Sequence, residues 1–600
     1  MLHYHVTLRP QAHSFDITLE IPEPDPDGQV LALPAWVPGS YMIRDLARHL
    51  VQISAATRGR PLAVTKFRKD HWRVDPGSGP LQIQYRIFAL DASVRTAYLD
   101  DTGGFFNGPA LFLRVLGQEH LAHEMTLIGP ETWQMATAMA AVAAEPWSFG
   151  RYGAADYAEF IDHPVILGQL AYVRFPVLHR PHSLILQGQH HADLLRLGRD
   201  LETLCTWQNR FWEATPFRHY LFLCQATADG YGGLEHRASS ALICRRSDLP
   251  TALQTSPEEG YYRFLGLASH EYFHAWLVKA IRPAVLAASD LSAEALTRDL
   301  WVFEGITSYY DDLALLRCGL LPEAQYLRGL GREITRLLRS PGRQRQSLGA
   351  SSQDAWIKLY HPGPNTPNAE ISYYNKGMLV ALCLDLHLRR ESAGQCSLDM
   401  VLQALWQAHG ATESPLPEGG FIAAAERATG MALAETLRPW IEDTGELPLA
   451  EFLSAFGITL RLRSAEGPED QGGTTPPAGP AAAARPWLGA RWKAGMLGAE
   501  LVHVWTDGPA ERAGLAPGDQ IIALDRLHCH DRNLQERLAA YPLNTTVALH
   551  FFRGDLLRQT ELLLTSAPED TAYLEKLGGL DAVVADRQRL WLYGATAGKS

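Results

Sequence analysis

The sequence predicts a multidomain α+β protein. Three observations support this fold class: strict apolar alternation before about residue 170, helical spacing of apolar residues between about 257 and 455, and a Pro, Gly and Ala-rich stretch at 464–486 that precedes a second β-rich segment. A chain of 600 residues is also too long for one core, and at about 150 residues per domain it suggests three or four units.

Composition argues against two classes of partner. The net charge of −12 is spread without long runs of one sign, so neither nucleic acid nor an anionic membrane is expected to bind. The N-terminus lacks a basic region followed by an apolar one, and no apolar run reaches 18 residues. The 7 cysteines are scattered and form no C-x-x-C pair, which favours reduced thiols. We therefore expect a cytoplasmic protein.

Residues 1–170 are expected to form a β-rich, sandwich-like domain. Residues 13–21 alternate apolar and polar side chains, and residues 83–87 repeat the pattern, as in strands with one buried face. Pro and Gly clusters at 22–28 and 75–80 indicate turns.

Two aromatic segments of this domain are expected to be loops with exposed rings. They are residues 36–41, Trp-Val-Pro-Gly-Ser-Tyr, and residues 103–108, Gly-Gly-Phe-Phe-Asn-Gly, which contain Asn107. Either loop could reach a neighbouring active site, or it could pack on its own domain. The role of Asn107 stays open.

Residues 171–463 are expected to form one α+β domain, in which a small sheet is followed by a helical body. Apolar residues at helical spacing predict a helix at 193–212, and after residue 257 the chain is strongly helical. Short apolar runs predict strands at 183–186, 220–224 and 241–244.

The remaining chain divides into three parts. Residues 464–486 cannot bury enough apolar area to fold and are expected to be a flexible linker. A compact β-rich module follows at 487–566. Residues 567–600 form a tail with a helical stretch expected near 570–577.

The segment His270-Glu271-Tyr272-Phe273-His274 matches H-E-x-x-H. Two histidines four residues apart lie on one helical face and can bind zinc, with the intervening Glu as general base. The helix predicted at 261–281, ended by Arg282-Pro283, is apolar on nearly every side and is therefore buried. Its polar groups must be paired or bound to a metal, since a buried unpaired charge costs several kcal/mol. The alternative is a buried helix with two satisfied histidines.

A catalytic zinc site needs a third protein ligand besides a water molecule. Glu304 is the strongest candidate, on a helix predicted at 293–316, because its neighbours Trp301 and Phe303 indicate a buried face. A helical hairpin can bring Glu304 against the first helix. The alternative is a solvated Glu on a helix surface.

Two further segments offer catalytic or binding groups. Residues 371–377 place phenols at the start of a helix predicted at 378–388, where a hydroxyl could donate to a developing oxyanion, although packing is the commoner role for such a residue. Residues 232–236, Gly-Gly-Leu-Glu-His, join two predicted strands. The glycines allow close backbone approach and Glu235 could hold an ammonium group, whereas the alternative is a turn with an exposed Glu.

Taken together, these segments resemble the glycyl aminopeptidase family, zinc peptidases with a thermolysin-like catalytic domain and a PDZ domain, distantly related to aminopeptidase N and leukotriene A hydrolase. The resemblance extends over nearly the whole chain in order. It rests on residues 36–41, 232–236, 270–276, 281–283, 301–310 and 372–377.

The resemblance implies one zinc ion per chain, bound by His270, His274 and Glu304. It also implies that Glu271 is the general base and proton shuttle, and that Tyr374, in a Tyr-x-Lys-Gly run, stabilises the oxyanion.

By the same resemblance, Glu235, beside Gly232 and Gly233, grips the free α-amino group of the substrate. The chain departs from aminopeptidase N at His236, where that relative has Asn, and in a longer spacing between the second histidine and the third ligand. The role of His236 stays open. A preference for N-terminal Gly or Ala is implied by the family alone.

Residues 487–566 resemble a PDZ domain. Leu488, Gly489 and Ala490 fit the loop whose backbone amides bind a peptide C-terminal carboxylate, and a peptide would add to the sheet edge beside a helix at 533–540. The alternative is a module that only packs on the catalytic domain.

The sequence therefore predicts a zinc-dependent aminopeptidase acting on peptide substrates, with a further peptide C-terminus as a ligand of the PDZ module. One alternative is a thermolysin-like endopeptidase to which this module delivers polypeptides. Another is a PDZ scaffold on a silent peptidase, which the intact ligand set disfavours.

Overall fold

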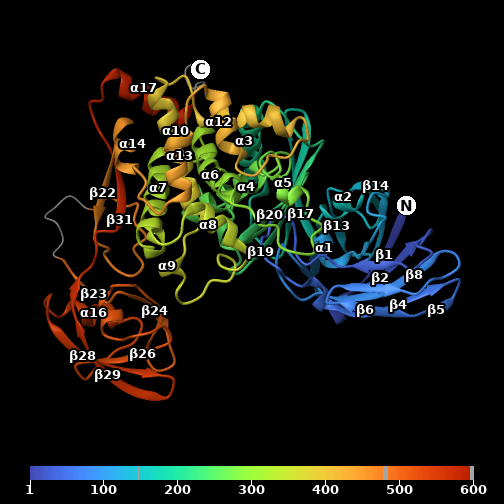
Figure 1. The fold of residues 1–600 in the computed structure, drawn as a ribbon, viewed down its shortest axis with the longest axis horizontal. Helices are drawn as coiled ribbons and strands as arrows, with labels where there is room; N and C mark the ends of the chain where they lie inside the picture. Colours follow the sequence, from blue (N-terminus) through green and yellow to red (C-terminus); the bar gives the residue numbers. More distant parts are fainter. Residues whose placement is uncertain (146, 477–483, 595–600) are drawn as a thin grey trace. The chain divides into compact units, whose positions relative to one another are not determined.

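The computed structural model describes residues 1–145, 147–476 and 484–594. The chain forms two compact units, the first made chiefly of Met1–Leu296 and the second chiefly of Leu321–Val401 and the chain from Gly419 onward (Figure 1). Among the described residues, no helix combines the length and the apolar character needed to span a membrane.

The first unit begins with a β-rich domain built around an eight-stranded sheet, drawn from dark blue to blue-green in Figure 1. Strands Leu2–Arg9, Ser14–Ile21 and Leu81–Phe88 of this sheet bury every second side chain over most of their length, as the alternation predicts. All neighbouring strands are antiparallel except β1 and β12, which are parallel. In sheet order the strands are β14 (Ala140–Ala143), β15 (Gly150–Ala154), β12 (His123–Ile128), β1 (Leu2–Arg9), β2 (Ser14–Ile21), β8 (Leu81–Phe88), β4 (Leu50–Thr57) and β5 (Arg60–Leu62).

Two four-stranded sheets share the core of this domain. Short helices α1 (Gly108–Leu111) and α2 (Tyr157–Ile161) complete it. The sheets are β13 (Gln134–Ala136), β16 (Val165–Gly168), β10 (Gly103–Phe106) and β9 (Ala97–Leu99), and β11 (Arg114–Val115), β3 (Val30–Ala32), β7 (His71–Val74) and β6 (Val64–Arg68).

The expectation of exposed aromatic rings in two loops of this domain is wrong. Trp36, Tyr41, Phe105 and Phe106 are all buried. Residues 103–106 form strand β10, which pairs with a neighbour on each side, so both rings are covered. Asn107, also buried, donates from Nδ2 to the Val94 carbonyl at 3.1 Å and thereby ties the end of β10 to the preceding loop.

A five-stranded mixed sheet follows and confirms the predicted strands. The predicted helix also forms, as α3 (Leu194–Trp212), with the Asp193 side chain capping its first turn. Residues 232–235 form an edge strand rather than a turn. In sheet order the strands are β17 (Leu170–Val177), β18 (Arg180–Gln187), β19 (Tyr220–Thr227), β21 (Ser239–Arg245) and β20 (Gly232–Glu235).

The helical region begins with α4 (Glu259–Phe273), which ends earlier than the expected residue 281. The second predicted helix begins at Trp301, not near residue 293, with a π-helical turn η4 (Trp301–Gly305) that leads into α6 (Ile306–Arg317). The other helices are α5 (Ala284–Ala287), α7 (Glu323–Leu338), α8 (Leu348–Gln353), α9 (Thr366–Ala369), α10 (Tyr373–Glu391), α11 (Leu398–Leu405), α12 (Gly420–Thr429), α13 (Ala434–Glu442) and α14 (Leu449–Ala455).

The helix expected near 570–577 is wrong, because this segment forms strand β31 (Thr571–Lys576), paired with β22 (Ile458–Arg463). Its buried Ala572 and Leu574 alternate with more exposed residues, which is a strand pattern. Helix α17 (Ala582–Tyr593) follows it.

Within the expected linker, residues 477–483 lie outside the described residues. Before them, the Gly473 amide donates to the Ala572 carbonyl at 2.7 Å.

Residues 486–566 form a separate β-rich module with its own core. Strand β24 is an edge strand of its main sheet. The helix expected at 533–540 is present as α16 (Leu534–Ala539). The other elements are β23 (Pro486–Trp487), β24 (Ala490–Ala494), β25 (Ala499–Val504), α15 (Pro509–Arg512), β26 (Gln520–Leu524), β27 (Leu527–His528), β28 (Thr546–Arg553), β29 (Leu556–Leu563) and β30 (Thr565–Ser566).

Candidate active site and metal centre

Helix α4 places the two histidines of the H-E-x-x-H segment one turn apart. Their Nε2 atoms lie 3.1 Å from each other. This is close to the separation of about 3.3 Å that two nitrogens have when each lies about 2.0–2.1 Å from one tetrahedral zinc ion. The distance between the two Nε2 atoms therefore suits two ligands of one metal ion.

Each imidazole is oriented through its other nitrogen. His270 Nδ1 lies 3.2 Å from Asp311 Oδ2, and His274 Nδ1 lies 3.0 Å from the Leu277 carbonyl oxygen. In these contacts the Nδ1–H donates, which leaves Nε2 as the atom that can bind a metal. Sequence reasoning missed Asp311. The only available signal was an acidic pair in an otherwise apolar helix.

The early end of α4 explains how His274 acquires its partner. His274 is the C-terminal cap of the helix, and the chain then turns because Val278 adopts a left-handed φ of 99°. The Ile281 amide donates to the Trp276 carbonyl at 2.8 Å and closes this turn. A helix continuing to residue 281 would have used the Leu277 carbonyl within its own ladder.

Glu304 lies in the π-helical turn η4 and is buried. A π-turn inserts one residue into a helix and re-aims the side chains around it. The next residue, Gly305, packs directly on α10, where an added Cβ would lie 2.6 Å from the Gly377 Cα. The assignment of Glu304 as a third metal ligand beside His270 and His274 stays a prediction. Two imidazoles and a carboxylate are a donor set that fits zinc.

Glu235 is buried at the end of β20, so the alternative of an exposed turn residue is wrong. Carboxylate oxygens of Glu235 and Glu271 and a ring nitrogen of His274 all lie within 4.8 Å of one another. Glu235 Oε1 has no hydrogen-bond partner among the described residues. The structure thus brings the predicted amine anchor beside the predicted base and one predicted metal ligand.

Two glycines make these close approaches possible. A Cβ on Gly233 would lie 2.1 Å from Glu271 Oε1, and a Cβ on Gly39 would lie 2.4 Å from Glu235 Oε1. The segment 36–41 of the N-terminal domain therefore contacts Glu235, the predicted amine anchor. Sequence reasoning had left this open.

Arg95 is a second residue from the N-terminal domain that sequence reasoning missed. Its Nη2 donates to the Gly233 carbonyl at 3.1 Å, and its Nη1 lies 3.8 Å from the position of a Cβ on Gly232. No local pattern identifies it. Its contact with Gly233 depends on the packing of two segments that lie more than 130 residues apart in the chain.

His236 belongs to a buried ionic cluster. Asp162 Oδ1 lies 3.3 Å from His236 Nδ1 and accepts from Lys279 Nζ at 2.6 Å. Burial by itself raises the pKa of Asp162, but the Lys279 ammonium and His236 outweigh it and hold this pKa well below its usual value. His236 therefore anchors the end of β20 to α2 and to the turn after α4.

Tyr374 lies in the first turn of α10, after the N-cap Ser372. Its hydroxyl lies 3.0 Å from the Tyr360 hydroxyl, and its ring stacks on Tyr373 with centroids 4.7 Å apart. Its assignment as oxyanion donor stays a prediction.

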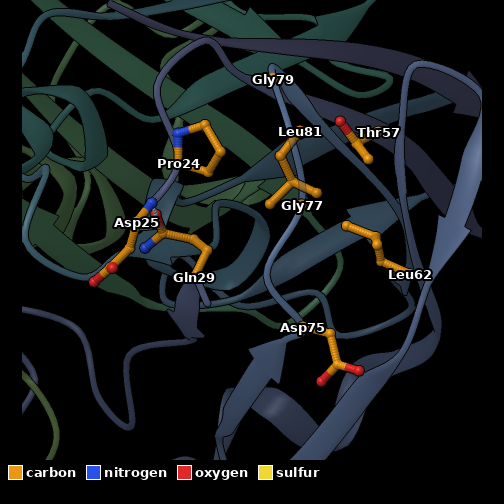
Figure 2. Close-up of a pocket in the computed structure, with 9 residues that line it drawn as sticks. All are labelled: Pro24, Asp25, Gln29, Thr57, Leu62, Asp75, Gly77, Gly79 and Leu81. Atoms are coloured by element: carbon orange, nitrogen blue, oxygen red, sulfur yellow. Dashed lines mark hydrogen bonds between the residues drawn. The ribbon is translucent and has the colours of Figure 1, made fainter. Parts of the chain in front are cut away.

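A pocket of the N-terminal domain is lined by residues of the turns at 24–29 and 75–80 and by Thr57, Leu62 and Leu81 of strands β4, β5 and β8 (Figure 2). Its volume is about 10 Å³, which is room for one water molecule at most. It is not a substrate site.

Two sequence models of peptidase domains match the chain. The sequence model of the Peptidase M61 N-terminal domain matches residues 3–169, and that of the M61 glycyl aminopeptidase matches residues 263–380. The crystal structure of an aminopeptidase N family protein from Idiomarina loihiensis is 35% identical, covers 99% of this chain and 100% of that chain, and has a TM-score of 0.94.

A more remote structure is the M1 zinc metallopeptidase from Deinococcus radiodurans, also solved as a mutant bound to a Tyr-Ser-Ala substrate. It is 13% identical, covers 75% of this chain and 94% of that chain, and has a TM-score of 0.48. No curated protein matches the sequence. Because the 35% identity extends over 99% of the chain and two M61 domains match in order, the chain belongs to the M61 glycyl aminopeptidase family of metallo-aminopeptidases.

Proposed function

We propose that the protein is a zinc-dependent aminopeptidase that hydrolyses the N-terminal peptide bond of peptides. One observation carries the proposal: Glu235, Glu271 and His274 offer atoms within 4.8 Å of one another. An α-ammonium group bound by Glu235 would place the first carbonyl of the peptide beside the base and the metal ligand. The bond presented for hydrolysis is then the first bond of the chain.

His270, His274 and Glu304 would bind one zinc ion per chain. Bound zinc supplies Lewis acidity, which polarises the scissile carbonyl and makes water more acidic. Glu271 accepts a proton from the attacking water at its carboxylate and then delivers it to the leaving amine. The absence of a side chain at Gly233 leaves the space that this carboxylate occupies.

Glu235 binds the substrate ammonium by a charge-assisted hydrogen bond. Its buried Oε1, without a partner among the described residues, supports this role. Because β20 is an edge strand, Gly232 and Gly233 can also pair with an extended substrate backbone. The Tyr374 hydroxyl donates to the oxyanion.

We further propose a preference for a small N-terminal residue such as Gly or Ala. The family description supports it, and so does the close packing of Gly39 on Glu235, which narrows the amine end of the site. The physiological substrates are peptides.

The module at 487–566 is proposed to be a PDZ domain that binds a peptide C-terminus along β24. Leu488–Ala490 would supply the carboxylate-binding amides, and the left-handed φ of 73° at Gly489 supports a tight loop there. The Asn368 side chain makes two hydrogen bonds with the module. Its Nδ2 donates to the Val504 carbonyl at 2.8 Å, and its Oδ1 accepts from the Thr506 amide at 3.0 Å. These two hydrogen bonds also support the alternative, in which the module only packs on the catalytic domain.

The test compares a peptide that has a free N-terminus with its N-acetylated twin. We expect hydrolysis of the free peptide alone, from its N-terminus. The variant Glu235→Gln should lose this activity and keep its zinc, whereas the exposed control Glu131→Gln should retain both. Equal hydrolysis of the acetylated peptide would instead establish the thermolysin-like endopeptidase.

A further inference from the structure

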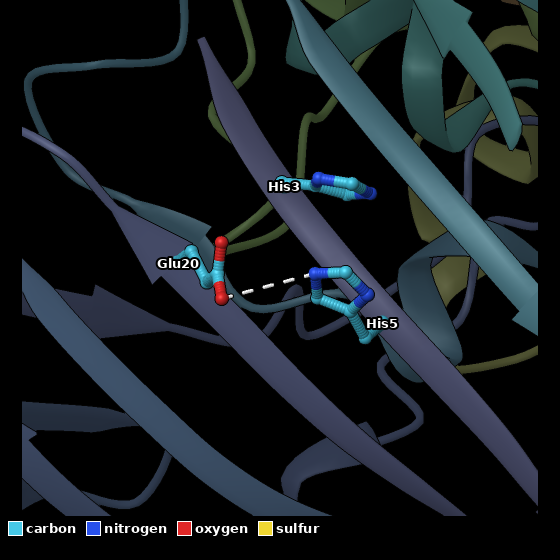
Figure 3. Close-up of side chains that lie close together, drawn as sticks. All are labelled: His3, His5 and Glu20. Atoms are coloured by element: carbon cyan, nitrogen blue, oxygen red, sulfur yellow. Dashed lines mark ion pairs between the residues drawn. The ribbon is translucent and has the colours of Figure 1, made fainter.

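Three side chains on the outer face of the eight-stranded sheet form a second group of potential metal ligands (Figure 3). His3 and His5 lie two residues apart on β1 and therefore point to the same face. Glu20 on β2 is the cross-strand partner of His3. Potential ligand atoms of the three residues lie within 4.8 Å of one another.

The sheet holds this group in a defined geometry. The imidazoles of His3 and His5 stack with centroids 4.1 Å apart, and His5 Nε2 lies 3.8 Å from Glu20 Oε1 (Figure 3). His3 Nε2 lies 2.8 Å from Thr126 Oγ1 on the neighbouring strand β12. Because the three strands are fixed by continuous ladders, only side-chain rotations are needed to bring the ligand atoms closer.

The local charges favour a cation here. The charges acting on His3 include two carboxylates, Glu20 and Glu124, and one guanidinium, Arg151. Arg151 forms an ion pair with Glu124 at 3.6 Å.

We propose that His3, His5 and Glu20 bind a divalent transition-metal ion, with Zn²⁺ as the best match, independently of the proposed catalytic centre. Two imidazoles and one carboxylate favour Zn²⁺ over Mg²⁺ or Ca²⁺, which prefer oxygen ligands only. The side chains of His5 and Glu20 are 38% and 50% exposed, so an ion can enter and both can rotate toward it. A fourth position stays open to water or to an outside ligand.

The test is calorimetric titration of ZnCl₂ into the full-length protein after its catalytic site has been loaded with zinc. We expect one further equivalent to bind, in the presence of excess Mg²⁺. The variants His5→Ala and Glu20→Gln should each bind this equivalent at least about tenfold more weakly, because even an outer-shell partner of a metal is worth about 10–100-fold.

Two variants serve as controls. Thr18→Ala changes the cross-strand partner of His5 on the same face, and His120→Ala removes an exposed histidine of the same domain. Both should bind the second equivalent as the wild type does. The proposal is overturned if no second equivalent binds, or if His5→Ala and Glu20→Gln bind it unchanged.

A spectroscopic readout separates ligation from a structural role. With Cu²⁺ at this site, the electron paramagnetic resonance spectrum should show coupling to two imidazole nitrogens, reduced to one in His5→Ala. Retention of both nitrogens in this variant would contradict the assignment.

Discussion

The contact between Gly39 and Glu235 makes Gly39→Ala the sharpest test of how the N-terminal domain shapes the site. A Cβ on Gly39 would lie 2.4 Å from Oε1, 2.6 Å from Oε2 and 2.7 Å from Cδ of Glu235. An ordinary contact begins near 3.4 Å. The Glu235 carboxylate must therefore move by about 1 Å, and a displacement of about 1 Å from productive geometry can reduce a rate about 100-fold.

We therefore expect kcat/KM on Gly or Ala p-nitroanilide to fall about 100-fold in Gly39→Ala, which corresponds to about 2.7 kcal/mol of transition-state stabilisation. Zinc content should not change, because Glu235 is not among the proposed ligands. Gly39 has a φ of 90°, so the variant also carries backbone strain of about 1–2 kcal/mol, visible as a lower Tm.

The variant Gly59→Ala separates the effect of backbone strain from the effect of an added Cβ that displaces Glu235. Gly59 has a similar φ of 77°, and an added Cβ would meet nothing within 4 Å. This control should show a comparable loss of Tm with unchanged kcat/KM. A folded Gly39→Ala enzyme with kcat/KM within about threefold of the wild type would refute the reasoning, as would an equal activity loss in Gly59→Ala.

Three further predictions concern single side chains. Asp311→Asn should weaken zinc binding about 10–100-fold in competition with a chelator, because Asp311 orients His270; unchanged affinity would contradict this role. Tyr374→Phe should lower kcat about 100- to 1000-fold with little change in KM or zinc content, as expected for a lost oxyanion donor, and a kcat within threefold would exclude that role. Burial lowers the pKa of His182 to about 4, below its ordinary 6.5, so the unfolded state binds more protons and stability falls as the pH drops from 6.5 to 4. At pH 5 this costs about 2 kcal/mol, so the Tm of His182→Gln should fall less between pH 7 and pH 5 than that of the wild type; an equal fall would disprove the effect.

Features with a local signature were predictable from the sequence. Alternation over 14–21 and 81–88 and helical spacing over 194–212 require only the side-chain periods of strand and helix. The same holds for the spacing of His270 and His274, which one helical turn brings together. Segments with weak or mixed periodicity were not predictable, as the strand at 571–576 shows.

The sequence by itself determined the donor types: two histidines one turn apart, a carboxylate between them and a second carboxylate in a buried apolar setting. Only the tertiary structure decided what surrounds them. Gly39 contacts Glu235 and Asp311 contacts His270 through packing between segments that are distant in the chain, and no local pattern records such a contact. The physical reason is that periodicity reports which face of an element is buried, whereas the partner on that face is set by how the elements pack.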